Sequence, residues 1–129
     1  MPTNGDLTQL LGHNLLEGRA LATSREYGLM ARPGARAYES REAGVEVLVD
    51  DADRVTTVVL HFTGDNGFKP FQGMIPGRGG TIGRRSKLWA ALGRPVSSGD
   101  VDEWPFPSFV MRAQYAPDGE TLLRLVLGR

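Results

Sequence analysis

The side chains able to do chemistry are few in this chain, and their spacing argues against an enzyme. His13 and His61 are the only histidines, and they lack the His-x-x-x-His spacing that places two metal ligands on one helical face. No serine lies in a Gly-x-Ser-x-Gly turn, and no cysteine is present, so the sequence indicates no nucleophilic serine or cysteine. Carboxylates are numerous, but nothing in the sequence pairs two of them for acid–base catalysis. We expect no catalysis, no cofactor and no metal.

One acidic turn could bind a cation. Asp50, Asp51 and Asp53 place three carboxylates close together, as a calcium loop does. The glycine at the sixth position and the late glutamate of such a loop are missing, however. We therefore interpret this segment as a solvated turn between two strands.

One basic segment could bind an anion. The glycine-rich run at residues 76–81 resembles a phosphate-binding turn ahead of a helix, and Arg78, Arg84 and Arg85 add positive charge there. The lysine followed by serine or threonine that closes a P-loop is absent. Binding of a small anion or a nucleotide by these three arginines is kept as the alternative function.

The remaining candidates are surfaces on which another protein could dock. Trp104 and Phe106 stand among prolines after an acidic stretch, and aromatic anchors surrounded by charge are typical of protein–protein hot spots. The same two side chains could instead fold into the core. Polar residues in the last hairpin alternate with apolar ones, which gives the sheet a polar face that binds a partner or is simply solvated. The predicted partner-binding residues are Asp102, Glu103, Trp104, Phe106, Arg112, Gln114 and Tyr115.

Periodicity and turn signals predict the elements of the first half. A short helix is expected to start at Asp6 and to end at Gly12. A capping box at Asn14 predicts a longer helix that ends at Gly28 and turns a stripe beginning with Leu16 inward. Three strands with β-branched content follow, at Ala35–Glu39, Val45–Val49 and Val55–Phe62.

The second half follows the same order after a connector at residues 63–80, rich in glycine and proline, whose Phe68 and Phe71 are expected to contact the core. A helix is predicted over Arg84–Leu92, and Gly93 ends it. An acidic loop at residues 97–103 and the Trp104 segment come next. Two alternating strands joined by a turn at residues 116–119 complete the chain, with one face formed by Phe109, Met111, Ala113, Tyr115, Leu123, Leu125 and Leu127.

The helix-then-hairpin order of residues 14–62 therefore returns in residues 81–127. Gly28 and Gly93, which end the helices, are about as far apart as the hairpin turns at Asp53 and Asp118. We predict an α+β fold in which two tandem helix-plus-antiparallel-sheet units form one continuous sheet with the helices on one face. The units span residues 6–62 and 81–127 within a single domain of residues 1–129.

Bulk composition limits the partners. With 129 residues, 40% of them hydrophobic, the chain can bury one core. The 15 basic and 15 acidic residues give a net charge of zero, so nucleic acid and membrane surfaces are not expected partners. The first residues have neither a basic segment nor an apolar run, so a cytoplasmic location is expected.

Two motifs resemble a recurring bacterial unit. The phrase Ala90-Ala91-Leu92-Gly93-Arg94-Pro95, between a short amphipathic helix and a hairpin, resembles the repeat of the β-lactamase-inhibitor-protein fold, shared with small lipoproteins of the outer-membrane barrel-assembly machinery. The segment at residues 71–77 resembles the aromatic-x-Gly-x-x-Pro-Gly linker of small bacterial proteins, some of which look like immunity proteins. The resemblance implies helices packed behind an antiparallel sheet whose concave face is the docking surface.

These observations predict a binding protein rather than an enzyme. The expected function is stoichiometric inhibition, as in an immunity protein that occludes the active site of a toxin or enzyme encoded nearby. The alternative is a regulator that binds a small anion or nucleotide at the basic connector. A homo-oligomeric structural protein is a third possibility, and the oligomeric state is left open.

Overall fold

The computed structural model describes residues 7–63 and 67–129 of the chain. Over these residues the fold is α+β, with two α-helices, short 3₁₀ turns and a single eight-stranded antiparallel sheet. The helices are α1 (Gly18–Tyr27) and α2 (Arg85–Leu92), and the 3₁₀ turns are η1 (Leu7–Leu10) and η3 (Pro76–Arg78). The strands are β1 (Met30–Ala31), β2 (Ala37–Ser40), β3 (Val45–Val49), β4 (Val55–His61), β5 (Val96–Ser98), β6 (Val101–Pro105), β7 (Val110–Tyr115) and β8 (Leu122–Gly128).

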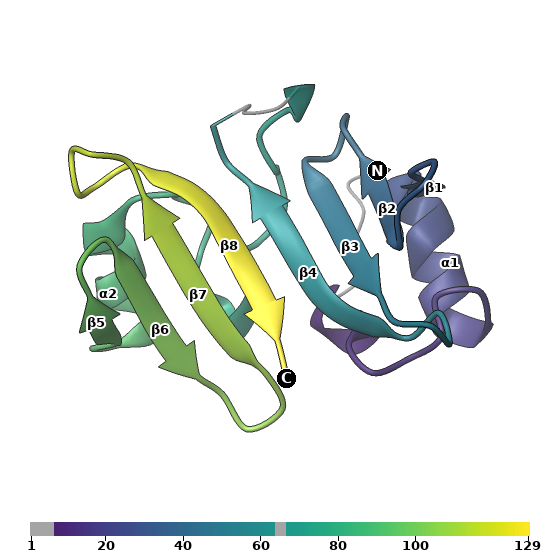
Figure 1. The fold of residues 1–129 in the computed structure, drawn as a ribbon. Helices are drawn as coiled ribbons and strands as arrows, with labels where there is room; N and C mark the ends of the chain where they lie inside the picture. Colours follow the sequence, from purple (N-terminus) through teal and green to yellow (C-terminus); the bar gives the residue numbers. More distant parts are fainter. Residues whose placement is uncertain (1–6, 64–66) are drawn as a thin grey trace.

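The strand order is β1-β2-β3-β4-β8-β7-β6-β5, so the last strand pairs with the fourth at the centre of the sheet. In the chain, α1 precedes β1–β4 and α2 precedes β5–β8. Figure 1 shows both helices behind the sheet, α1 near β1 and β2 and α2 near β5 and β6. The face of the sheet toward the viewer carries no helix, and we call it the open face.

Alternation along the strands builds the core between the sheet and the helices. Val47 of β3 pairs with Val58 of β4, which in turn pairs with Leu127 of β8, and all three side chains are fully buried. Leu88 of α2 is fully buried in the same core cluster. Burial of each such side chain contributes roughly 1.5–3 kcal/mol, so this layer is the main source of stability.

Both helices end where glycine was expected, but α1 starts later than predicted. Gly28 adopts a positive φ of 71° and Gly93 one of 88°, as C-terminal caps often do. The capping box does not form, because Asn14 Oδ1 instead accepts a bond from the Leu16 backbone N–H at 2.8 Å. This local turn buries Leu15 and leaves Leu16, predicted to face inward, half exposed.

The N-terminal segment and the strand boundaries differ less from the prediction. Leu7–Leu10 forms a 3₁₀ turn in place of an α-helix, and its predicted cap, Asp6, lies outside the described residues. β3 has its predicted bounds, β2 is shifted by two residues at its start, and β1 was not predicted. Phe68 and Phe71 of the connector are buried, as predicted.

The predicted acidic loop is a β-hairpin. Ser98 pairs with Val101, and Gly99, with a φ of 62°, allows the tight turn between β5 and β6. The acidic charge of this segment suggested a solvated loop, but alternation in β6 sends Asp102 and Trp104 toward α2 and Glu103 to the open face. A register shift after Gln114 changes the alternation in β8 as well, so Leu122 is buried and Leu123 is only half-buried.

Candidate binding surface

Three of the predicted partner-binding residues are buried on the helix side of the sheet. Asp102 has no exposed surface, and Trp104 and Tyr115 are each 4% exposed. The Trp104 indole Nε1 donates a hydrogen bond of 3.0 Å to the Gly93 carbonyl at the end of α2. The prediction that these side chains are surface contacts is therefore wrong, and the alternative of core packing holds for Trp104.

Asp102 is the centre of a polar cluster that joins α2 and β5 to β6. Its carboxylate accepts two hydrogen bonds from the Arg85 guanidinium, at 3.0 and 2.8 Å. It also accepts one from Trp89 Nε1 at 2.7 Å and one from Ser97 Oγ at 2.6 Å. Burial would raise the pKa of Asp102, but these donors outweigh it and lower the pKa below the ordinary 3.8. The ionised carboxylate is thus compensated on several sides.

Tyr115 lies beside this cluster. The Arg85 guanidinium stands over the Tyr115 ring at 4.8 Å from its centroid, a cation–π contact. The buried hydroxyl lies close to Asp102 without hydrogen-bond geometry to any atom of the described residues. Burial first, and the neighbouring Asp102 charge next, raise the pKa of Tyr115, so the phenol stays neutral at physiological pH.

Phe106 packs within the molecule rather than standing free. It is half-buried and stacks on Phe109, with ring centroids 4.7 Å apart and ring planes 20° apart. A side chain at Gly77 would collide with the Phe106 ring, because its Cβ would lie 2.5 Å from Cζ. Phe106 therefore holds the connector near η3, and only part of its ring can meet a partner.

Most arginines of the predicted anion site already face carboxylates of the chain. The Arg85 guanidinium is bound to Asp102, and Arg84 Nε lies 4.0 Å from Glu120 Oε1. The same Glu120 oxygen accepts the Ser86 backbone N–H at 2.8 Å. Arg78 is exposed and has a positive φ of 66°. Two of the three predicted anion ligands are thus already paired within the chain.

The other predicted residues reach the open face. Arg112 of β7 pairs with Glu103 of β6 on this face, and Arg112 Nε donates to Glu103 Oε1 at 2.7 Å. Gln114 of β7 stands opposite Arg124 of β8. The open face also carries half-buried apolar side chains, namely Leu48, Val59, Val101, Val110 and Val126.

A second polar group on the open face was missed by the sequence reasoning. Arg32 Nη2 lies 2.6 Å from Glu46 and 3.3 Å from Glu39, and Arg41 Nε lies 3.6 Å from Glu39. His61 Nε2 lies 3.3 Å from Glu46 Oε1. The hydrogen bond from Arg32 lowers the pKa of Glu39. Glutamates facing outward on two adjacent strands were a usable signal, because register places Glu39 opposite Glu46.

His61 is held in this group from a second side. It is buried, and the Phe68 ring stacks on it with centroids 4.1 Å apart and planes 12° apart. Phe68 comes from the connector, so the connector crosses the open face at the end of β4. This end of the face is accordingly covered by the chain itself.

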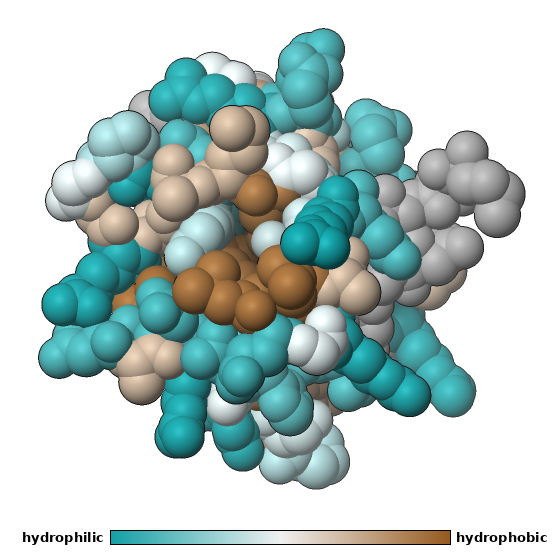
Figure 2. Space-filling model, turned by 90° about the vertical axis from the view of Figure 1, so that its right-hand side faces the viewer, coloured by the Kyte–Doolittle hydropathy of each residue, from teal (hydrophilic) through white to brown (hydrophobic). Residues whose placement is uncertain are grey.

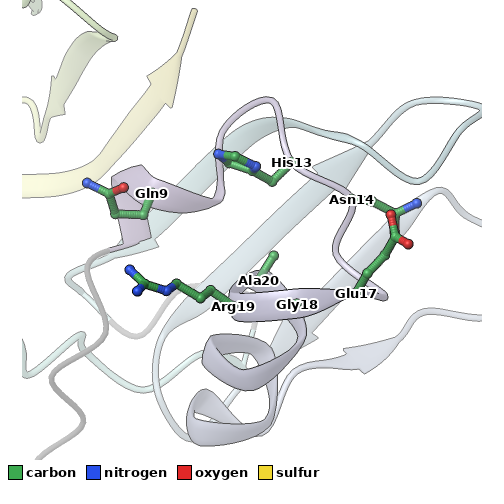
Figure 3. A pocket seen from close by; sticks show the side chains of 7 residues that line it. All are labelled: Gln9, His13, Asn14, Glu17, Gly18, Arg19 and Ala20. Carbon is green, nitrogen blue, oxygen red and sulfur yellow. The ribbon is translucent and has the colours of Figure 1, made fainter.

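The described surface has hollows beside both the open face and α1. One, of about 260 Å³, sits at the seam of β4, β8 and β7, and its lining includes Thr57, Val110, Arg112, Val126 and Gly128. The other, of about 420 Å³, lies in front of α1 (Figure 3), where Gln9, His13 and Arg19 border it and Asn14 and Glu17 lie at its other end. Only the first belongs to the open face.

Figure 2 shows the side of the molecule that carries α1. Hydrophobic side chains gather near the centre of this view, and hydrophilic ones surround them. In the described part of the chain, no helix is long and apolar enough to cross a membrane. Residues 7–63 and 67–129 also hold no cluster of three histidine, aspartate or glutamate side chains arranged for a metal ion.

Comparison with known proteins gives this chain no relatives: no family model, no curated protein and no solved structure matches it. Any functional conclusion therefore rests on the geometry above and on the motifs of the sequence.

Proposed function

We propose that this protein is a stoichiometric binding module that docks another protein on the open face of its sheet. The observation that carries the proposal is a helix-free face on which half-buried apolar side chains stand among charged ones. A solvated sheet face is usually polar, whereas the centre of a protein interface is apolar with a polar rim.

The open face has the size that such a role requires. Strands lie about 4.8 Å apart, so eight of them span roughly 34 Å. A standard interface buries about 800 Å² on each partner, which a face of this width can supply. Val59 and Val126 pair directly across the β4–β8 seam and would lie near the middle of the contact.

We further propose that binding inhibits the partner by covering its active site, as an immunity protein does. In this proposal the chain consists of two tandem units, α1 with β1–β4 and α2 with β5–β8, and acts in the cytoplasm. The helix that precedes each set of four strands and the symmetric strand order about β4 and β8 support the duplication. The resemblance to the β-lactamase-inhibitor-protein fold supports the mode of action.

The test compares two double variants in the same pull-down. Val59→Gln with Val126→Gln removes apolar surface from the centre of the open face without changing charge. Ala22→Gln with Ala90→Gln, at exposed positions on α1 and α2, is the matched control. Tagged wild type and both variants are incubated with native lysate, and the captured protein is then purified and titrated by calorimetry.

We expect one partner at 1:1 stoichiometry, bound by the wild type and the control and at least tenfold more weakly by the open-face variant. The activity of that partner should fall as the complex forms. A partner held equally by the open-face variant would contradict the proposal. So would the absence of any partner from a lysate shown to contain the neighbouring gene products.

A further inference from the structure

Two arginines stand close together on the open face. Arg112 of β7 is opposite Val126, and Arg124 of β8 is opposite Gln114, so the arginines are diagonal neighbours on adjacent strands. Diagonal neighbours in an antiparallel pair lie about 7–8 Å apart, within reach of one another's charge. This arrangement is unfavourable for the isolated fold unless negative charge offsets it.

The two halves of the open face differ in how many carboxylates stand beside their arginines. On the β1–β3 side, Arg32 and Arg41 face Glu39 and Glu46, so two cations meet two anions. On the β6–β8 side, Glu103 is paired with Arg112. Within residues 7–63 and 67–129, the side chain of Arg124 has neither a salt bridge nor a hydrogen bond, so one cation is left over.

Arg124 also carries an unsatisfied donor. Its Nε is buried, and no acceptor among the described residues bonds to it. A buried N–H without an acceptor is costly and rare in folded proteins. This nitrogen is closed to solvent, so an acceptor from outside the chain can meet only the part of the Arg124 guanidinium that the surface exposes. Arg124 as a whole residue is half-buried and stands opposite His61, so part of its side chain keeps access to the surface of the open face.

The surface next to these arginines has room for an acidic side chain. Gly128 stands between Thr57 and Val110 across the two strand pairings, and its missing side chain opens the hollow of about 260 Å³ that Arg112 borders. A carboxylate lying over Val126 and Gly128 could reach the free nitrogens of Arg112. A second carboxylate nearby could accept from Arg124.

We propose that the partner of the open face presents an acidic segment, with at least two aspartate or glutamate side chains that bind Arg112 and Arg124. This inference rests on the proposed function and adds the chemistry of the partner. Phosphates of a nucleic acid fit the face less well, because a nucleic acid brings a continuous row of negative charges, and Glu39, Glu46 and Glu103 would repel those that lie away from Arg112 and Arg124.

The test is a titration of isotope-labelled protein, followed by amide chemical shifts. The probes are a flexible peptide of alternating glutamate and glycine, the same peptide with glutamine in place of glutamate, and a short DNA duplex. The variants are Arg124→Gln, Arg112→Gln and Arg124→Lys, which keeps the charge but lacks the planar guanidinium. Arg25→Gln, at an exposed position on α1, is the control.

We expect the glutamate peptide to shift amides of β7 and β8. Its affinity should be at least threefold lower for R124Q and for R112Q than for the wild type, and unchanged for R25Q. The affinity for R124K should lie between those of the wild type and R124Q. Equal binding of the glutamine peptide would overturn the proposal. So would shifts confined to other elements, no shift at millimolar peptide, or tighter binding of the duplex. A partner captured through Val59 and Val126 but held equally by the R112Q/R124Q double variant would refute acidic recognition while leaving the proposed function intact.

Discussion

Arginine occurs in two contrasting settings on opposite faces of the same sheet. On the helix side, Arg85 binds the fully buried Asp102, and two further donors complete that carboxylate. On the open face, Arg124 has a buried Nε with no acceptor in the described residues. On the helix side, the Asp102 carboxylate finds all of its hydrogen-bond donors within the chain, and these bonds hold α2 against the sheet. The second setting leaves the charge of Arg124 without a carboxylate in the described residues.

Removal of Asp102 should have the largest effect of any change discussed. Asp102→Ala leaves Arg85, whose side chain is 23% exposed, without its partner, and deprives Trp89 and Ser97 of their acceptor. Breaking a buried ion pair on one side typically costs about 3–5 kcal/mol. We expect a loss of that size in the free energy of unfolding, measured by urea denaturation. Glu103→Gln, the adjacent position in β6, should lose less than about 1 kcal/mol. Equal losses in both variants would show that the Asp102 cluster contributes no more to stability than an exposed pair does.

The same cluster predicts a pH dependence. The pKa of Asp102 is lowered in the folded state relative to the ordinary 3.8. Its stabilising contribution is therefore fully present above the unfolded pKa, and it is lost as pH falls below 3.8 and through the folded pKa. Urea denaturation from pH 7 downward should give a difference between wild type and Asp102→Asn that is constant at neutral pH and shrinks below pH 3.8.

A difference between the two proteins is needed because other carboxyls also titrate at low pH. Asp118 has its pKa lowered to about 2 by the Thr121 hydroxyl and by the backbone N–H groups of Glu120 and Thr121. That contribution is common to both proteins and cancels in the comparison. A difference that is independent of pH down to pH 2 would contradict the assignment to Asp102.

Trp104 allows a finer test on the helix side. Trp104→Phe keeps an aromatic ring in the core but removes the donor that bonds to the Gly93 carbonyl at 3.0 Å. We expect a loss of about 1–3 kcal/mol in the free energy of unfolding, because the hydrogen bond to the Gly93 carbonyl is lost and the ring becomes smaller. Phe106→Leu, at a half-buried position, should cost less. A larger loss of stability in Phe106→Leu than in Trp104→Phe would show that Phe106 makes the more important contact of this segment.

The sequence predicted the elements whose signals are local. Helix ends at Gly28 and Gly93 and the bounds of β3 follow from backbone freedom and β-branched content, which neighbours in the chain decide. The hairpin of β5 and β6 was missed because its acidic residues suggested water. The charge of Asp102 is instead compensated by Arg85 from another element, and no local pattern encodes that pairing.

The candidate site divides in the same way. Alternation correctly placed Arg112 and Gln114 together on one face of β7, since a period of two is a property of the strand itself. It could not show that β8 pairs with β4, which brings Arg124 opposite His61 and places Gly128 opposite Thr57 at the hollow. Trp104 and Tyr115 were misassigned because aromatic content is equally typical of a hot spot and of a core.

The smallest expected effect on stability belongs to Arg124, and it is the one that separates the two arginine settings. Arg124→Gln removes a charge that has no partner in the described chain and that stands diagonal to Arg112. We expect the free energy of unfolding to stay within about 0.5 kcal/mol of wild type, or to rise slightly as repulsion is relieved. Arg112→Gln, measured alongside, should lose slightly more because it breaks the pair with Glu103. If Arg124→Gln destabilised the protein as strongly as Asp102→Ala does, Arg124 would belong to the architecture. The contrast between the two faces would then have to be abandoned.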